Sequence, residues 1–190
     1  GAVCAVAYSA CGDLARSEPA ADSPIVPGLT NLQFALAVAA GPAFGDPFSG
    51  HFLAGEFAAD GLPVGLQHVT VDRWLDFLES GVPFGSVAFE LDQTRLIGDC
   101  TDLPYDDLLS QVTVPVLSVA AGGGLGQYTD HSLDLLGSAD VTRLEVHTNP
   151  DPALDFGHID LLLGNNAESL VWRPILRWID RHTGPNGGRD

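Results

Sequence analysis

Methionine and lysine are absent from this chain of 190 residues, and all eight basic residues are arginine. The chain also has 25 aspartate and glutamate residues, which give a net charge of −17. The negative electrostatic field of such a chain repels phosphate groups, so nucleic acid and anionic membrane surfaces are poor partners. The hydrophobic content of 45% argues against a disordered acidic tail. We expect a secreted or extracellular protein from this acidic, lysine-free composition, and the alternative is a cytoplasmic one.

Cysteine is also scarce, with only Cys4, Cys11 and Cys100. Three cysteines allow at most one disulfide, and none shows the CxxC spacing typical of a zinc site. No apolar run reaches the roughly 18 residues that a membrane-spanning helix needs. We therefore predict no metal, no organic cofactor and no transmembrane segment.

The chain opens on an apolar run, residues 2–8, without a basic leader or an initiating methionine. The run predicts a buried strand. We expect the chain to be a piece of a longer polypeptide, because a domain rarely begins within a strand. A strand with an open edge and no gatekeeping charge also predicts poor solubility, or dimerisation through that edge.

Strand and helix patterns alternate along the rest of the chain. We predict helices at 31–40, 71–80, 130–137 and 166–182, strands at 112–121 and 141–147, and weaker elements at 86–91 and 104–110. Pro174 should kink the last helix or mark its restart. Alternation of this kind is typical of an α/β fold with a parallel sheet covered on both faces.

Ser9 lies between the predicted strand and a possible short helix, with Ala7 and Cys11 two residues to either side. Small residues at these positions are typical of a nucleophile elbow, whose tight turn excludes bulky side chains. The simpler interpretation is a serine that ends a strand. Cys11 as a thiol nucleophile is a third, weaker interpretation.

His158 stands in a Gly-His-Ile-Asp run just before the last predicted helix. A catalytic base needs an imidazole held on a loop near the nucleophile. We interpret Asp160 as a structural carboxylate that binds backbone groups of this loop. The remaining histidines are interpreted as structural or surface residues: His51, His68, His131, His147 and His182.

Residues 112–182 resemble the C-terminal end of the α/β-hydrolase superfamily. Val-Pro-Val-Leu at 114–117 resembles its penultimate core strand. The segment 156–164, with the helix residues that follow as far as 179, is similar to the catalytic-histidine loop and final helix of lipases and esterases. The resemblance implies Ser9 as nucleophile, His158 as base and Ala10 as a backbone oxyanion donor.

The family places its catalytic acid after the penultimate strand, where residues 121–126 contain no carboxylate. Asp130 is the nearest candidate, with Asp140 and Asp155 as alternatives. The strands that precede the nucleophile in that family are also missing from this sequence. The resemblance therefore implies a companion segment or sister chain that supplies them.

The expected fold is a partial α/β-hydrolase, a mostly parallel half-sheet with flanking helices. Its core would span 1–27 and 106–183, with a helical lid insertion at 28–105 and a polar tail at 184–190. The expected function is hydrolysis of carboxylic esters with an apolar acyl or alcohol group. The alternative is a non-catalytic, hydrolase-like binding subunit. Aromatic residues of the lid would line the substrate pocket, or else form an ordinary core: Phe44, Phe48, Phe52, Phe57, Trp74 and Phe77.

Overall fold

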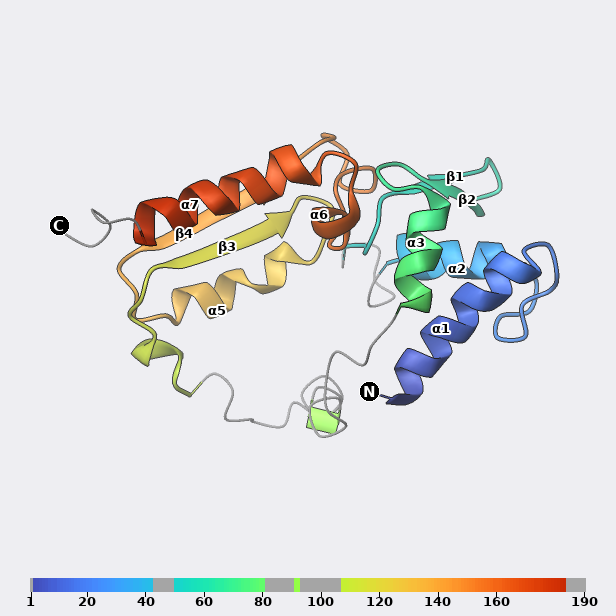
Figure 1. Cartoon of the computed structure of the whole chain (residues 1–190), viewed down its shortest axis with the longest axis horizontal. Helices are drawn as coiled ribbons and strands as arrows, with labels where there is room; N and C mark the ends of the chain where they lie inside the picture. The colour runs from blue at the N-terminus through green and yellow to red at the C-terminus, as the bar shows by residue number, and fades with distance from the viewer. Residues whose placement is uncertain (1, 43–49, 81–90, 93–106, 184–190) are drawn as a thin grey trace.

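The structure is a computed structural model that describes residues 2–42, 50–80, 91–92 and 107–183. Figure 1 shows two lobes that meet near the middle of the molecule. One lobe holds three helices and a short antiparallel hairpin. Its elements are α1 (Ala2–Ser17), α2 (Asn31–Ala40), β1 (Gly55–Phe57), β2 (Pro63–Leu66) and α3 (Val71–Glu79).

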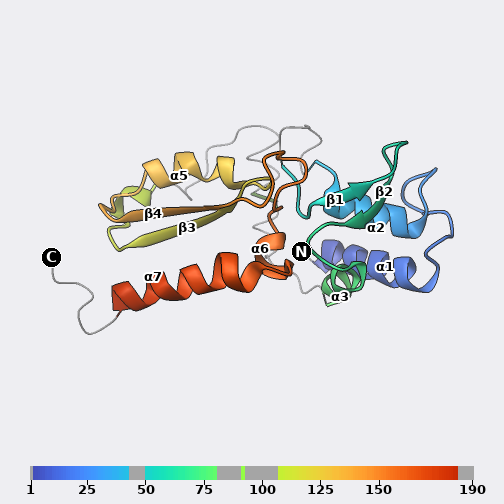
Figure 2. The same ribbon diagram turned by 90° about the horizontal axis from the view of Figure 1, so that it is seen from above.

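The second lobe is built on two parallel strands, β3 (Val116–Ala121) and β4 (Val141–Val146). Helices α5 (Asp130–Asp134) and α7 (Arg173–Thr183) lie on opposite faces of this pair (Figure 2). The shorter elements are η1 (Leu109–Gln111), η2 (Gly126–Tyr128), α6 (Asp160–Leu163) and the π-helical turn η3 (Glu168–Trp172).

The mixture of helices and strands confirms the general α/β class. The pairing of β3 with β4 is regular, from Val116 opposite Val141 to Ala121 opposite Val146. In the part of the chain that the structure describes, this is the only parallel pair. The finer expectation of a hydrolase half-sheet, and of a companion that extends it, stays a prediction.

The predicted strand at residues 2–8 is wrong, because this run forms the first part of α1. A short apolar run does not distinguish a buried strand from a helix by periodicity. Alanine, the strongest helix former, recurs along α1 and decides the outcome here. The solubility argument from an open strand edge at this run therefore no longer holds.

Several other elements were predicted correctly. The helix α2 has the predicted bounds and begins with a capping box between Thr30 and Gln33. The helix α3 matches the helix predicted at 71–80 to within one residue, and it buries the apolar side chains of Trp74, Leu75 and Leu78. The strand β4 follows the prediction to within one residue, whereas β3 begins four residues later than predicted, directly after Pro115. The restart before Pro174, where η3 gives way to α7, also follows the prediction.

The apolar core forms two clusters, one in each lobe. Residues Cys11 and Ala15 of α1 pack with α2, α3 and β2 in the first. Residues Ala121, Val146 and Phe156 belong to the second, under α7. The chain is thus divided differently from the expected core and lid, since α1 packs with the predicted lid rather than with the parallel strands.

The segment 51–54 joins the lobes through backbone hydrogen bonds. His51 donates to the Gly123 carbonyl at 2.9 Å and accepts from the His158 N–H at 3.0 Å. Ile159 donates to the Phe52 carbonyl at 2.7 Å. These bonds hold the ends of the parallel strands against the first lobe.

Residues 86–90 of the predicted strand, residues 104–106 of the predicted turn and the polar tail at 184–190 lie outside the described residues. In the described part of the chain, no helix is both long and apolar enough to cross a bilayer.

We expect Leu53→Ala to lower the free energy of unfolding by about 2–5 kcal/mol, because this fully buried side chain leaves a cavity in the first cluster. Chemical denaturation measures the change. The matched control is Leu162→Ala, since Leu162 is 60% exposed and its truncation should stay within about 0.5 kcal/mol of the parent. Equal changes in the free energy of unfolding for the two substitutions would contradict the packing of Leu53 in the first cluster.

Candidate active site

The structure does not place Ser9 at an elbow. Ser9 is half-buried within α1, eight residues before the helix ends at Ser17. A nucleophile elbow needs a sharp turn between a strand and a helix, and α1 has none here. Ala10 lies in the same helix, where a backbone N–H donates to the carbonyl four residues earlier. Neither residue has the geometry that the resemblance implied.

His158 does lie on the loop that follows β4, at the carboxyl ends of the two parallel strands. Its backbone N–H is fixed by His51, and its ring is exposed and meets Phe52 edge-on at 6.5 Å between centroids. Partial desolvation lowers the pKa of His158. Its ring makes no hydrogen bond to Ser9 or to an acid among the described residues.

Asp130 does not orient His158. It is the exposed first residue of α5, and its carboxylate lies 3.7 Å from Nε of Arg143. The predicted triad of Ser9, His158 and Asp130 is thus not assembled by any hydrogen bond in the described part of the chain.

The two alternative acids each pair with a histidine that sequence analysis had assigned to structure or surface. Asp140 lies 3.0 Å from Nε2 of His182, while the other nitrogen of that ring donates to the Trp178 carbonyl at 2.7 Å. This pair ties the end of α7 to the start of β4. The second acid, Asp155, pairs with His147 at the other end of β4.

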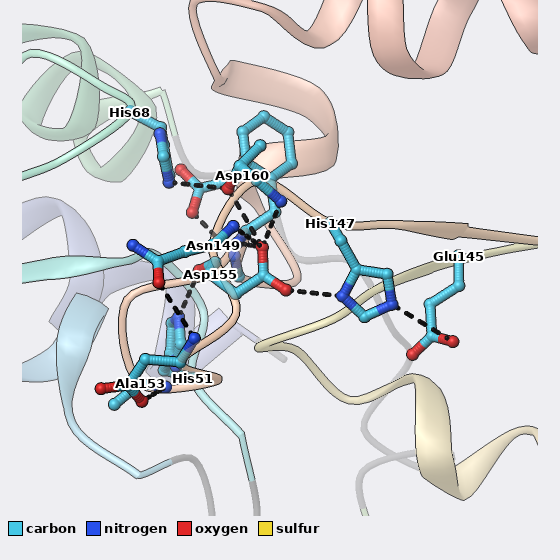
Figure 3. Close-up of polar contacts among 12 residues, drawn as sticks. His51, His68, Glu145, His147, Asn149, Ala153, Asp155 and Asp160 are labelled. Atoms are coloured by element: carbon cyan, nitrogen blue, oxygen red, sulfur yellow. Dashed lines mark hydrogen bonds and ion pairs between the residues drawn. The ribbon is translucent and has the colours of Figure 1, made fainter.

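His147 and Asp155 form a hydrogen-bonded dyad (Figure 3). His147 directly follows β4, and its Nδ1 lies 2.7 Å from Oδ2 of Asp155. The Asp155 side chain is 1% exposed, whereas that of His147 is 57% exposed. The other ring nitrogen, Nε2, lies 3.4 Å from Oε2 of Glu145. A buried carboxylate therefore orients an accessible imidazole.

Asp155 is held in place by the loop around it. Its Oδ1 accepts from the backbone N–H groups of Thr148, Asn149 and Phe156 at 2.5, 3.0 and 2.8 Å. The Thr148 hydroxyl adds a fourth bond at 3.0 Å. These donors supply the compensation that a buried carboxylate requires. Asp155 therefore presents Oδ2 to His147 from a fixed position.

The dyad shifts the pKa values of both partners. Burial alone would raise the pKa of Asp155, but hydrogen bonds from Thr148, His147 and the loop backbone together lower it. The hydrogen bond to Asp155 raises the pKa of His147, partial desolvation opposes this, and Glu145 raises it further. Both shifts favour an ionised carboxylate beside a protonated imidazole.

The absence of a side chain at Gly122 makes room for the dyad of His147 and Asp155. A Cβ atom at this position would collide with Oδ2 of Asp155 and with Nδ1 of His147. Gly122 also donates its N–H to the Val146 carbonyl at 2.9 Å, which places it directly beside the end of β4. The glycine run after β3 therefore serves the close approach of two loops.

Asp160 is a structural carboxylate, as predicted. Its side chain is fully buried, and Oδ2 accepts from the N–H groups of Ala54 and Gly157 at 2.9 and 2.8 Å. Oδ1 is buried without a hydrogen-bond partner. Desolvation raises the pKa of Asp160, while those two backbone bonds and the nearby His68 and His51 oppose the rise.

Two cavities flank the dyad and share Gly122 and Pro152 in their walls. The smaller, of about 340 Å³, contains His147, Asp155, Thr148 and Asn149 in its lining. The larger, of about 530 Å³, is lined by residues of both lobes, including Ala40, Phe57, Ala121 and Glu145. Glu145 thus links the larger cavity to the dyad.

The aromatic residues predicted to form the pocket separate into three groups. Phe57 lines the larger cavity, and Phe52 lies against His158. Trp74 and Phe77 stack on each other at 5.7 Å and belong to the first core cluster, so their assignment to a pocket was wrong. Phe44 and Phe48 lie outside the described residues.

Cys11 does not fit the alternative role of a thiol nucleophile. It is a free cysteine buried in the first core cluster. Desolvation raises its pKa, which favours the unreactive thiol over the thiolate. In the part of the chain that the structure describes, no cluster of three or more metal-ligating side chains could hold a metal ion.

Sequence analysis missed the role of His147. The available signal was the position of this histidine directly after a strand, with an aspartate in the same loop. Nothing in the sequence indicated that Asp155 would fold back onto the ring.

Comparisons with known proteins found no matching family model, no matching curated protein and no matching solved structure. The α/β-hydrolase resemblance therefore remains an interpretation of the sequence pattern.

We expect Asp155→Asn to lower the pKa of His147, because the amide removes the charge and the strongest hydrogen bond that favour the imidazolium. NMR titration of the His147 ring protons measures the shift. The control is Asp134→Asn, which removes an exposed carboxylate bonded to Arg143 instead. An unchanged His147 pKa in Asp155→Asn would refute the dyad.

The same dyad predicts how stability depends on pH. The raised pKa of His147 contributes stability below its ordinary pKa, and this is lost as pH rises through the folded-state value. The lowered pKa of Asp155 contributes stability above its ordinary pKa, and this is lost as pH falls through the folded-state value. Thermal melts at a series of pH values should show both losses of stability. In Asp155→Asn, the melting temperature should depend less on pH. A parent-like pH profile in that variant would contradict the linkage.

Proposed function

We propose that this chain hydrolyses carboxylic esters, with His147 as general base and Asp155 as the carboxylate that orients it. The observation that carries the proposal is the 2.7 Å bond between Nδ1 of His147 and the buried carboxylate of Asp155. An imidazole held in this way keeps Nε2 as the nitrogen that exchanges protons with the reacting groups.

The nucleophile in this proposal is water. Ser9 lies in α1, Cys11 is buried, and the Thr148 hydroxyl already donates to Asp155. The group that faces Nε2 of His147 is Glu145, whose side chain is 62% exposed and therefore free to move aside for water. The described residues of the site thus support direct hydrolysis rather than an acyl-enzyme.

In the proposed hydrolysis, His147 alone carries the proton from water to the leaving alcohol. Neutral His147 takes a proton from water at Nε2, and the hydroxide adds to the ester carbonyl carbon. The tetrahedral intermediate collapses, the bond to the alcohol oxygen breaks, and Nε2–H returns its proton to that oxygen. The products are a carboxylate with its released proton and an alcohol. Asp155 stays ionised throughout.

The position of the dyad supports a catalytic role. His147 and Gly122 lie directly after the two parallel strands, and ligands in open α/β sheets bind beyond the carboxyl ends of the strands. The larger cavity beside the dyad offers Ala40, Phe57 and Ala121 to an apolar acyl or alcohol group. The lipase and esterase resemblance of 156–179 agrees with this chemistry, although our proposal assigns the base to His147 instead of His158.

A non-catalytic binding role is the alternative, because the predicted triad is not assembled. Ser9 lies within a helix and Asp130 pairs with Arg143, so neither residue is available to His158. A companion segment that extends the parallel sheet remains a further proposal, and assays should include the longer polypeptide where the gene encodes one.

We expect His147→Ala to reduce ester hydrolysis by roughly 10²–10⁴-fold, the usual contribution of a general acid–base group. Release of p-nitrophenol from short-chain esters measures the rate. The controls are His131→Ala, an exposed histidine on α5, and Ser9→Ala, and both should retain parent activity. If His158→Ala abolishes turnover while His147→Ala does not, the base assignment is wrong; an inactive parent chain supports the binding role.

The pH dependence gives a second test. A general base must be deprotonated, and the pKa of His147 is raised. Turnover should therefore increase as pH rises through a value above the ordinary histidine pKa, then reach a plateau. Glu145→Gln should shift this rise to lower pH, because Glu145 contributes to the raised pKa. A profile that is flat across this range would contradict the role of His147.

A further inference from the structure

Glu145 is the charged group closest to the reacting position of the proposed site. Its Oε2 lies 3.4 Å from Nε2 of His147, and its side chain lines the larger cavity. Glu145 and His147 are two residues apart at the end of β4, where alternate residues point to the same side of a strand. Figure 3 shows the Glu145 carboxylate facing the imidazole. A group bound by this carboxylate would therefore lie beside the base.

The part of the chain that the structure describes places no arginine in the walls of the larger cavity. Its histidine, His51, is buried and donates Nε2–H to the Asp155 carbonyl at 3.0 Å. Among the described residues that line this space, Glu145 is the one carboxylate. With a net charge of −17 on the whole chain, the cavity repels anionic substrates and attracts cations.

The rest of the wall suits an alkylated cation. Phe57 offers a half-exposed aromatic ring, and Ala40, Pro42 and Ala121 offer apolar surface. Aromatic faces bind quaternary ammonium groups, while a carboxylate supplies the opposite charge. A small, strongly hydrated metal ion would find no second carboxylate on the described residues of this wall.

We propose that the site selects esters that carry an organic ammonium group, with Glu145 as the residue that recognises the charge. This inference rests on the proposed hydrolase function and names its substrate class. The cation binds beside Glu145 and Phe57, and the ester carbonyl reaches His147. Because the cation pairs with Glu145, it also draws that carboxylate away from Nε2 and leaves the base nitrogen free to accept a proton.

The test uses two esters of nearly equal shape, acetylcholine and its uncharged carbon analogue 3,3-dimethylbutyl acetate. We expect kcat/KM to favour the cationic ester by roughly threefold to tenfold, the effect of one partly exposed charge pair. Added salt should reduce the preference, because it screens exposed charges. Measurements belong on the pH plateau, where a shift in the pKa of His147 does not alter the ratio.

Glu145→Gln should bring the ratio of the two kcat/KM values close to one. The matched control is Glu168→Gln, since Glu168 is an exposed glutamate on η3 that pairs with Arg173. It should leave the parent ratio unchanged. Equal rates for the two esters in the parent, or an unchanged ratio in Glu145→Gln, would overturn the inference while the hydrolase proposal stands.

Binding separates failure of the inference from failure of the proposed function. If neither ester is hydrolysed, the hydrolase proposal fails, and choline binding is then titrated by NMR on the parent and on Glu145→Gln. Binding that is lost in Glu145→Gln and kept in Glu168→Gln supports the cation site by itself. Absence of choline binding to the parent overturns it.

Discussion

The loop between β4 and α6 depends on two carboxylates that are almost completely removed from water. Burial of an ionised carboxylate is costly unless hydrogen-bond donors compensate it. Asp155 accepts hydrogen bonds from backbone N–H groups at the start of this loop. Asp160 accepts them from the N–H of Gly157 in the loop and from the N–H of Ala54 in the other lobe. Because these bonds fix the backbone, the position of His147 follows from them. The site geometry is therefore a consequence of the backbone hydrogen bonds that Asp155 and one oxygen of Asp160 accept.

The same loop determines how the lobes meet. Apolar packing contributes, since Ile159 and Leu163 of the second lobe pack against the cluster of the first. The segment 51–54 adds hydrogen bonds to the glycine run after β3, to the backbone of the His158 loop and to Asp160. The larger cavity takes residues from both lobes, so its shape depends on these contacts. In the proposed function, substrate selection would therefore depend on the same contacts that join the lobes.

The sequence predicted the elements that carry a strong local signal. A helix with a capping box, an amphipathic helix with its apolar residues on one face, and a proline at a helix restart are determined by neighbouring residues, and α2, α3 and α7 follow the prediction. The first apolar run was ambiguous, and the strand interpretation then placed Ser9 at an elbow that does not exist. Asp160 was interpreted correctly, because a carboxylate so close to His158 can bind the loop backbone. The partner of Asp155 was not predictable, since it depends on how the loop folds back over Gly122.

Two histidines of this loop show why residue type alone does not assign a role. His147 lies between two carboxylates, which raise its pKa, whereas desolvation lowers the pKa of His158. At a pH between these two values, His147 carries the charge and His158 does not. The resemblance to lipases and esterases directs attention to His158, because that histidine stands in the recognisable run of residues. The electrostatics favour His147, because a base needs an oriented ring and a carboxylate that stabilises its protonated form. Asp155 bonds to the ring of His147, and the described part of the chain gives the ring of His158 no such carboxylate, so our proposal assigns the base to His147.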